Sequence, residues 1–277
     1  MKGWKGMHRT MNTDMIHSNA PSEITPLLRV ENLCKYFDLP TGETLKACDC
    51  KSLTVDKGKS LGIVRESGSG KTTLMKMIMP LIPASSGSIY FKGHAIECRK
   101  ATQQLDYHHH IQMVFQDSTT AFDPRMKIAD ILCEPLYNQG LLKGRKAVAV
   151  AADYLAMVEL PPGIARRYPH ELSGGQRQRI AIARALVANP DIINFDEATS
   201  ALDVSVQDAV ARLLVKLQKE HGYTYIFVAH DIAFVRCICH KVAVMHKGKL
   251  VDYLDADELV QSDNPYTRRL IQSVYEI

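Results

Sequence analysis

The sequence predicts an α/β fold in which a largely parallel β-sheet carries helices on both faces. Short apolar runs, bounded by glycine or polar turns, alternate with longer segments whose apolar residues have helical spacing. Near residue 121 this alternation breaks, and the consecutive helical patterns that follow predict an α-helical insert over about 121–187. The chain has 277 residues, of which 46% are hydrophobic and 23% charged, so it can bury a sizeable core.

The predicted elements follow in order along the chain. Apolar runs predict strands over 27–37, 87–93 and 111–117, and residues 50–64 predict a strand, a turn at Asp56-Lys57-Gly58 and a buried strand over 60–64. Helical spacing predicts helices over 71–79, 126–140 and 144–160. After the insert, strands are expected over 191–195, 223–230 and 241–254, and helices over 174–188, 204–221, 232–239 and 264–277.

Composition narrows the class of protein. A net charge of +4 is too small to indicate nucleic-acid binding. The seven cysteines include no C-x-x-C unit, which argues against structural zinc and favours free thiols. No apolar run is long enough to predict a transmembrane helix. Residues 1–25 are polar and lack the apolar region of a signal peptide, so we expect a flexible extension before a folded domain over 26–277.

A glycine-rich segment between a predicted strand and a predicted helix indicates a phosphate-binding loop. It consists of Gly68, Ser69, Gly70, Lys71 and Thr72. Glycines let backbone N–H groups surround an anion, the lysine reaches the β- and γ-phosphates, and the threonine hydroxyl can bind Mg²⁺. A glycine turn that happens to precede Lys-Thr is the simpler alternative, but the strand–loop–helix setting favours a nucleotide site.

Two further segments carry the residue types that nucleotide chemistry needs. Asp196 and Glu197 end an apolar strand, where one carboxylate can hold a metal ion and the other can orient and deprotonate water. Ser173, Gly174 and Gly175 open a long helix, whose N-terminus presents unpaired N–H groups to an anion. Taken singly, the first could be a solvated acidic turn and the second an ordinary serine cap.

Two other clusters are weaker candidates. His108, His109 and His110 suggest metal binding, but adjacent side chains on a strand point to opposite faces and cannot all reach one ion. Cys237 and Cys239 fall on a predicted helix, where residues two apart do not share a face, so we interpret them as packing residues.

Five motifs stand in one order along the chain: SGSGKTT, VFQD, LSGGQRQRIAIARAL, FDEATSALD and VAHD. Together they resemble the ATP-binding subunit of ABC transporters, and the resemblance covers about residues 27–277. Within that family, AFDPRMKIADILCEPL, SALDVSVQ and NPYTRRLIQSV resemble the branch that serves oligopeptide, dipeptide and nickel importers. LSGGQ is far more selective than a lone phosphate-binding loop.

This resemblance implies a P-loop NTPase core, with a mainly parallel sheet, an antiparallel β subdomain and the helical insert. It implies an ATPase that uses ATP and Mg²⁺ on the cytoplasmic face of the membrane. Its partners would be membrane permease subunits, a second ATPase subunit and, indirectly, an extracytoplasmic solute-binding protein, with no nucleic acid.

The resemblance also implies roles for individual residues. Lys71 and Thr72 would bind phosphate and magnesium, Asp196 would be a second magnesium ligand, and Glu197 would be the catalytic base. His230 would contact the γ-phosphate, and Gln116 would sense both magnesium and the attacking water. The remaining nucleotide contacts would come from Glu66, Ser67, Gly68, Ser69, Gly70 and Thr73 in the loop, Ser173, Gly174, Gly175 and Asp203 across a dimer interface, and an adenine-stacking aromatic, Phe37 or the neighbouring Tyr36.

Three positions depart from the family pattern. Arg65 replaces the first loop glycine, Ala198 replaces a proline, and Asn194 interrupts an apolar strand. Arg65 would strain the loop by roughly 1–3 kcal/mol if its backbone requires a positive φ, and would be tolerated if it ends the strand in an extended conformation. The alternative function is therefore a hydrolysis-impaired nucleotide-binding partner in a heterodimeric transporter.

Overall fold

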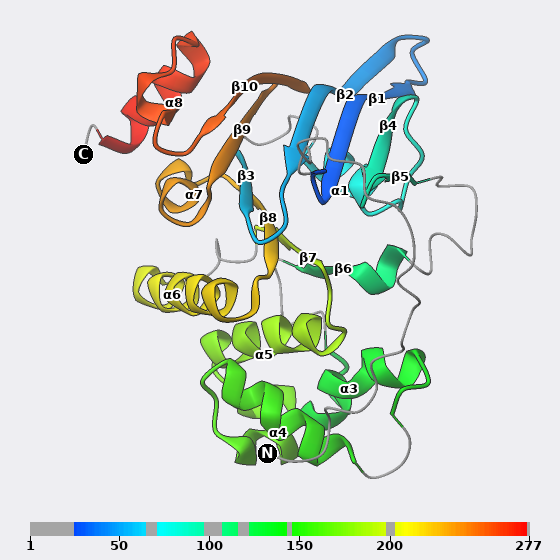
Figure 1. Ribbon diagram of the computed structural model, residues 1–277, viewed down its shortest axis with the longest axis vertical. Coiled ribbons are helices and arrows are strands. Elements are labelled where there is room, and N and C mark those ends of the chain that lie inside the picture. Colours follow the sequence, from blue (N-terminus) through cyan, green and yellow to red (C-terminus); the bar gives the residue numbers. More distant parts are fainter. Residues whose placement is uncertain are drawn as a thin grey trace, which may run out of the picture.

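The computed structural model describes residues 25–64, 71–96, 107–115, 122–142, 146–197 and 203–275. Within these ranges the strands join one ten-stranded sheet in the order β5-β4-β1-β2-β10-β9-β3-β8-β7-β6 (Figure 1). The strands are β1 (Leu28–Asp38), β2 (Thr44–Val55), β3 (Ser60–Val64), β4 (Ser86–Phe91), β5 (His94–Ala95), β6 (Ile111–Val114), β7 (Ile192–Asp196), β8 (Thr224–Ala229), β9 (Lys241–His246) and β10 (Lys249–Asp255).

The sheet has a parallel half and an antiparallel half. β9, β3, β8, β7 and β6 pair in parallel, with β3 between β8 and β9. β1 pairs antiparallel with both β2 and β4, and β4 pairs antiparallel with β5. The predicted combination of a parallel core with an antiparallel β subdomain is confirmed.

The stretch 241–254 forms a hairpin rather than a continuous strand. Lys247 and Gly248 have positive φ values of 47° and 79°, which suits the tight turn between β9 and β10. A Cβ on Gly248 would lie 2.8 Å from the Lys46 carbonyl oxygen of β2, so the turn also needs a residue without a side chain.

Helices cover both faces of the parallel half, as predicted. The helices are α1 (Lys71–Ile78), α3 (Ile128–Asn138), α4 (Ala147–Met157), α5 (Gly174–Val187), α6 (Val204–His221), α7 (Ile232–Ile238) and α8 (Pro265–Tyr275), with short 3₁₀ turns η1 (Pro162–Arg166), η2 (Pro169–Glu171) and η3 (Leu259–Gln261). Apolar residues of α1 pack with one face of β3 and β8, and those of α6 and α7 pack with the other. Buried apolar residues alternate between these two clusters along β7 and β8, which is the pattern of a strand covered on both sides.

The range predicted for the helical insert, 121–187, contains α3, α4, η1, η2 and α5. The helices α3, α4 and α5 contact one another, and Figure 1 shows them grouped at the end of the molecule opposite the antiparallel strands. Their buried side chains, among them Ile131, Leu132, Leu155 and Ile180, belong to the same core cluster as α6. No helix among the described residues is both long enough and apolar enough to span a membrane.

Gly62 lets helix α7 lie directly on the central strand β3. A Cβ at this position would overlap the Val235 side chain of α7 and would lie 3.1 Å from the Cys239 sulfur. Val235 is fully buried and β-branched, so it cannot move aside easily. The contact fixes the position of α7, which begins just after His230.

We therefore expect Gly62→Ala to reduce the free energy of unfolding by roughly 1–3 kcal/mol, the usual cost of adding a methyl group to a packed core. Gly163 is a matched control, because a Cβ there would meet no atom within 4 Å. Thermal unfolding of the two variants checks the prediction. Equal melting temperatures would show that α7 is not packed against Gly62.

The cysteines and histidines fall differently from the predictions in two places. Cys239 is buried as predicted, but Cys237 is exposed, so the packing interpretation is wrong for Cys237. The histidine triplet lies in a helical turn, residues 107–110, rather than on a strand. His110 Nδ1 lies 2.7 Å from the Asp191 carboxylate, which also pairs with Lys92.

Burial raises the pKa of Cys48 and Cys50 to about 12, which keeps both thiols protonated and unreactive.

Asn194 is fully buried in β7 and only partly satisfied. Its side-chain amide donates to the Met79 sulfur at 2.9 Å. Its carbonyl oxygen has no hydrogen-bond partner among the described residues. The residue is therefore accommodated at a cost in stability rather than by a full set of partners.

Candidate nucleotide site

The predicted phosphate loop joins the central strand to a helix. β3 is buried along its whole length and ends at Val64, and α1 begins at Lys71. The loop itself, from Arg65 through Glu66, Ser67, Gly68 and Ser69 to Gly70, lies outside the described residues, as do the side chains of Lys71 and Thr72. Thr73 lies half-buried in the first turn of α1. The described backbone therefore has the strand-then-helix arrangement that a phosphate-binding loop requires.

Asp196 and Glu197 lie at the carboxyl end of β7, two strands away from β3. Parallel pairing of β7, β8 and β3 brings their carboxyl ends to the same edge of the sheet. Asp196 is half-buried and pairs with Val228 of β8. Ala198 lies outside the described residues.

Glu197 adopts a strained backbone conformation. Its φ is +50°, and its N–H donates to the Val228 carbonyl oxygen at 2.9 Å. A left-handed glutamate costs energy and persists only where neighbouring structure holds it, which is common at functional sites.

His230 contacts Glu197 across the strand ends. Its Nε2 lies 2.8 Å from the Glu197 Oε1, and the two side chains are 37% and 18% exposed. His230 follows directly after β8, the strand next to β7. Two residues that the resemblance places on the γ-phosphate and the attacking water are thus hydrogen-bonded neighbours, a contact that the sequence did not predict.

Ser173 caps helix α5 on an exposed surface. Its hydroxyl accepts from the Gln176 N–H at 3.3 Å, and the Gln176 side chain accepts from the Ser173 N–H at 3.0 Å. This reciprocal pairing is a capping box. A Cβ on Gly174 would meet no atom within 4 Å, so Gly174 has open space at its side.

The Ser173 segment lies beside the beginning of α6, where Asp203 is exposed. A Cβ on Gly175 would lie 3.0 Å from the Val206 side chain in the first turn of α6. The Asp203 carbonyl oxygen accepts from the Val206 and Gln207 N–H groups, while its carboxylate makes no cap hydrogen bond. Figure 1 shows α5 well apart from α1. These residues thus form a second surface, separate from helix α1.

The two candidate aromatic residues are both available for stacking. Tyr36 and Phe37 lie near the end of β1 and are 37% and 40% exposed. The Lys35 ammonium lies 5.1 Å from the centre of the Phe37 ring. Exposure therefore supports a surface role for this segment and is against placing Phe37 in the core.

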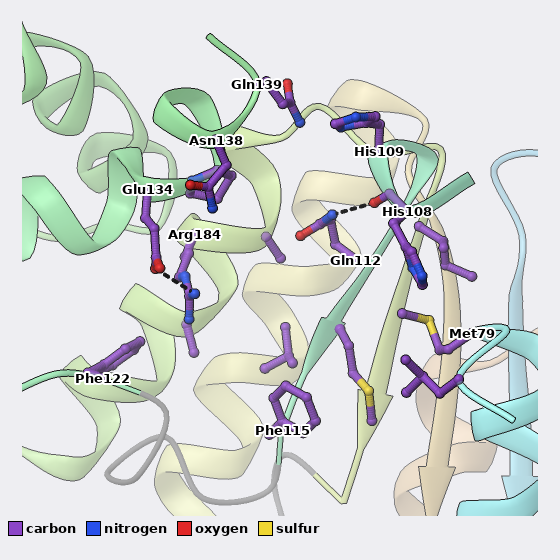
Figure 2. Close-up of a pocket in the computed structure, with 17 residues that line it drawn as sticks. Met79, His108, His109, Gln112, Phe115, Phe122, Glu134, Asn138, Gln139 and Arg184 are labelled. Carbon is purple, nitrogen blue, oxygen red and sulfur yellow. Dashed lines mark hydrogen bonds and ion pairs between the residues drawn. The ribbon is translucent and has the colours of Figure 1, made fainter. Parts of the chain in front are cut away.

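A cavity of about 400 Å³ lies between β6 and the helices α3 and α5 (Figure 2). It was not predicted from the sequence, because its lining comes from segments far apart in the chain. Phe115, which is 54% exposed, lines it just before Gln116, and Gln116 lies outside the described residues. On the helical side, Arg184 of α5 pairs with Glu134 of α3 at 2.7 Å. Ala181, Met113 and Phe122 contribute apolar surface.

Among the described residues, no group of three or more histidine, cysteine or acidic side chains forms a metal cluster. The resemblance instead implies that Mg²⁺ would be held by oxygen ligands of Thr72, Gln116 and Asp196, and of these side chains the structure describes that of Asp196.

Known proteins share this fold and these motifs. The sequence model of the ABC transporter family matches residues 49–200. The oligopeptide transport ATP-binding protein OppF of Bacillus subtilis is 43% identical over 251 residues, covering 90% of this chain and 82% of OppF. The glutathione import ATP-binding protein GsiA of Shigella dysenteriae is 42% identical over 256 residues, covering 90% of this chain and 41% of GsiA.

Solved structures of ABC transporter cassettes resemble this chain in fold. CbiO1 of Clostridium perfringens, part of an ABC transporter complex, has a TM-score of 0.74 at 26% identity and covers 91% of this chain and 99% of CbiO1. The ATP-binding cassette MJ0796, as a dimer in a post-hydrolysis state with ADP and Pi, has a TM-score of 0.71 at 27% identity, with coverage of 83% and 98%. Fold, motif order and identity over most of its length together place the chain in the ABC transporter family.

Proposed function

We propose that this chain is the ATP-binding and ATP-hydrolysing subunit of an ABC importer that takes up peptides, or nickel or a related solute, across the cytoplasmic membrane. The peptide assignment is supported by 43% identity to OppF and 42% identity to GsiA, whose names specify oligopeptide transport and glutathione import. The single observation that carries the ATPase is the Glu197–His230 pair at the carboxyl ends of β7 and β8, at the same sheet edge as the end of β3.

In the proposed mechanism, Lys71 and the loop N–H groups hold the phosphates of ATP at the N-terminus of α1. Glu197 orients the attacking water and accepts its proton, and the His230 imidazole donates a hydrogen bond to the γ-phosphate. Thr72, Asp196 and Gln116 would hold Mg²⁺, which when bound offsets the negative charge that develops on the phosphates. Glu197 and His230 exchange their mutual contact for contacts to water and phosphate as ATP enters.

A second ATPase subunit, identical or related, would complete each site. Ser173 and Gly174 are exposed and Gly175 is half-buried at the N-terminus of α5, whose N–H groups favour an anion held by another chain. Asp203 is exposed and lies near them, because it caps α6 and the first turn of α6 contacts Gly175 through Val206. We propose that this surface closes on the ATP bound at Lys71 of the partner.

The cavity next to Phe115 would receive a cytoplasmic segment of the permease. Its apolar lining and Glu134–Arg184 pair offer both burial and orientation to an inserted helix or loop. Because Gln116 follows Phe115, the docked segment would sense the nucleotide through this residue. We propose on this basis that residues 121–187 face the permease and that the chain is a peripheral subunit on the cytoplasmic face. The solute-binding protein would be reached only through the permease.

Uptake of a labelled oligopeptide by cells that lack the chromosomal copy tests the function. Wild-type protein is expected to restore uptake, and Ala181→Trp is expected to abolish it, because the indole would fill the cavity without touching the nucleotide site. Val148→Trp is the matched control, since Val148 is exposed on α4 and does not line the cavity.

The outcomes separate the parts of the proposal. Restored uptake of nickel but not of peptide would assign nickel as the transported solute and leave the ATPase function as proposed. Full uptake with Ala181→Trp would show that the permease does not dock in this cavity. Failure of the wild-type chain to support uptake of either solute would contradict the importer function.

A further inference from the structure

Asp231 lies between His230 and helix α7. Its carboxylate accepts from the N–H groups of Ala233 and Phe234 at 2.8 and 3.0 Å. These are the donors that an N-cap satisfies, and the Asp231 backbone is extended, as an N-cap requires.

His230 and the cap residue Asp231 are the two residues between the strand β8 and the helix α7. β8 is buried along its length and paired on both sides, and it ends at Ala229. α7 is held on β3 by the Gly62–Val235 contact and by an edge-to-face pairing of Phe234 with Phe227 of β8. The backbone of His230 is therefore set from one side by β8 and from the other by the first turn of α7.

We propose that Asp231 is a positioning residue for His230: by capping α7 it fixes the backbone that aims the imidazole at Glu197 and at the γ-phosphate. The inference rests on the proposed function of His230. Without the cap, the first turn of α7 would lose two hydrogen bonds, and the His230 side chain, which is 37% exposed, would sample positions away from Glu197. Small displacements of a catalytic group cost rate rather than ATP affinity.

The test compares kcat and KM for ATP in four variants. Asp231→Ala is expected to lower kcat about tenfold with KM for ATP changed less than about twofold, as expected for a misplaced catalytic group. Asp231→Asn and Asp231→Ser are expected to keep kcat within about twofold of wild type, because asparagine and serine are good N-caps. Asn264→Ala is the matched control: Asn264 caps α8 through the Tyr266 and Thr267 N–H groups at 2.9 and 3.4 Å, away from the site.

A double-variant cycle shows whether Asp231 acts through His230. If it does, Asp231→Ala changes kcat less than about twofold in a His230→Ala background. An equal loss in both backgrounds, or a normal kcat for Asp231→Ala beside a reduced kcat for His230→Ala, overturns the inference alone. An equal loss of kcat for Asn264→Ala would mean that losing any helix cap lowers kcat through general destabilisation, and it would also overturn the inference. A normal kcat for His230→Ala overturns both the role proposed for His230 and the inference.

Discussion

Glu197→Gln is expected to lower steady-state ATP hydrolysis at least ~100-fold, which is the usual contribution of a general base. The amide keeps the size and hydrogen-bonding reach of the carboxylate but cannot accept a proton at neutral pH. Glu197 is 18% exposed, lies 2.8 Å from His230, and is held in a left-handed conformation. ATP binding is expected to remain, because the phosphates are held by the loop before α1.

Phosphate release measured beside equilibrium ATP binding checks this prediction. Glu220→Gln is the control, because this glutamate is exposed near the end of α6 and takes no part in the proposed site. Hydrolysis at the wild-type rate would assign the base to another residue. Loss of ATP binding would mean that Glu197 holds the nucleotide rather than the water.

His230→Ala is expected to lower kcat about 10- to 100-fold, somewhat less than loss of the base, because its hydrogen bond stabilises transition-state charge rather than transferring the proton of water. KM for ATP is expected to change little. His221→Ala is a suitable control, since its side chain is 41% exposed near the end of α6, against 37% for His230.

The kcat and the KM for ATP of His230→Ala together show which role His230 has. A large rise in KM with an unchanged kcat would make His230 a binding residue for ground-state ATP. An unchanged kcat and KM would remove it from the site.

Most elements of the fold could be predicted because each carries a local signal. β3 and α6 occupy the residues predicted for them, 60–64 and 204–221, since a buried strand after a glycine turn and a long amphipathic helix are strong patterns. The β9–β10 hairpin was harder to predict, because Lys247-Gly248 is a short turn inside one apolar run. The exposure of Cys237 follows from packing of α7, which helical spacing alone does not fix.

The site was predictable as a set of motifs and not as contacts. The strand ends of β3, β7 and β8 follow from parallel pairing, which is why Lys71 and Glu197 could be expected near one another. The Glu197–His230 contact and the positive φ of Glu197 are properties of the folded chain, and nothing in the local sequence indicates either. The cavity beside Phe115 needs the relative placement of β6, α3 and α5, which is a property of tertiary packing.

The most direct test of the central claim is the chemical state of nucleotide held by the Glu197→Gln protein. After incubation with radiolabelled ATP and Mg²⁺ and removal of free nucleotide, we expect the bound label to be recovered as ATP, while wild-type protein yields ADP. Recovery of ADP from Glu197→Gln would show that the bond is cleaved without this carboxylate, and would contradict the assignment of Glu197 as the base.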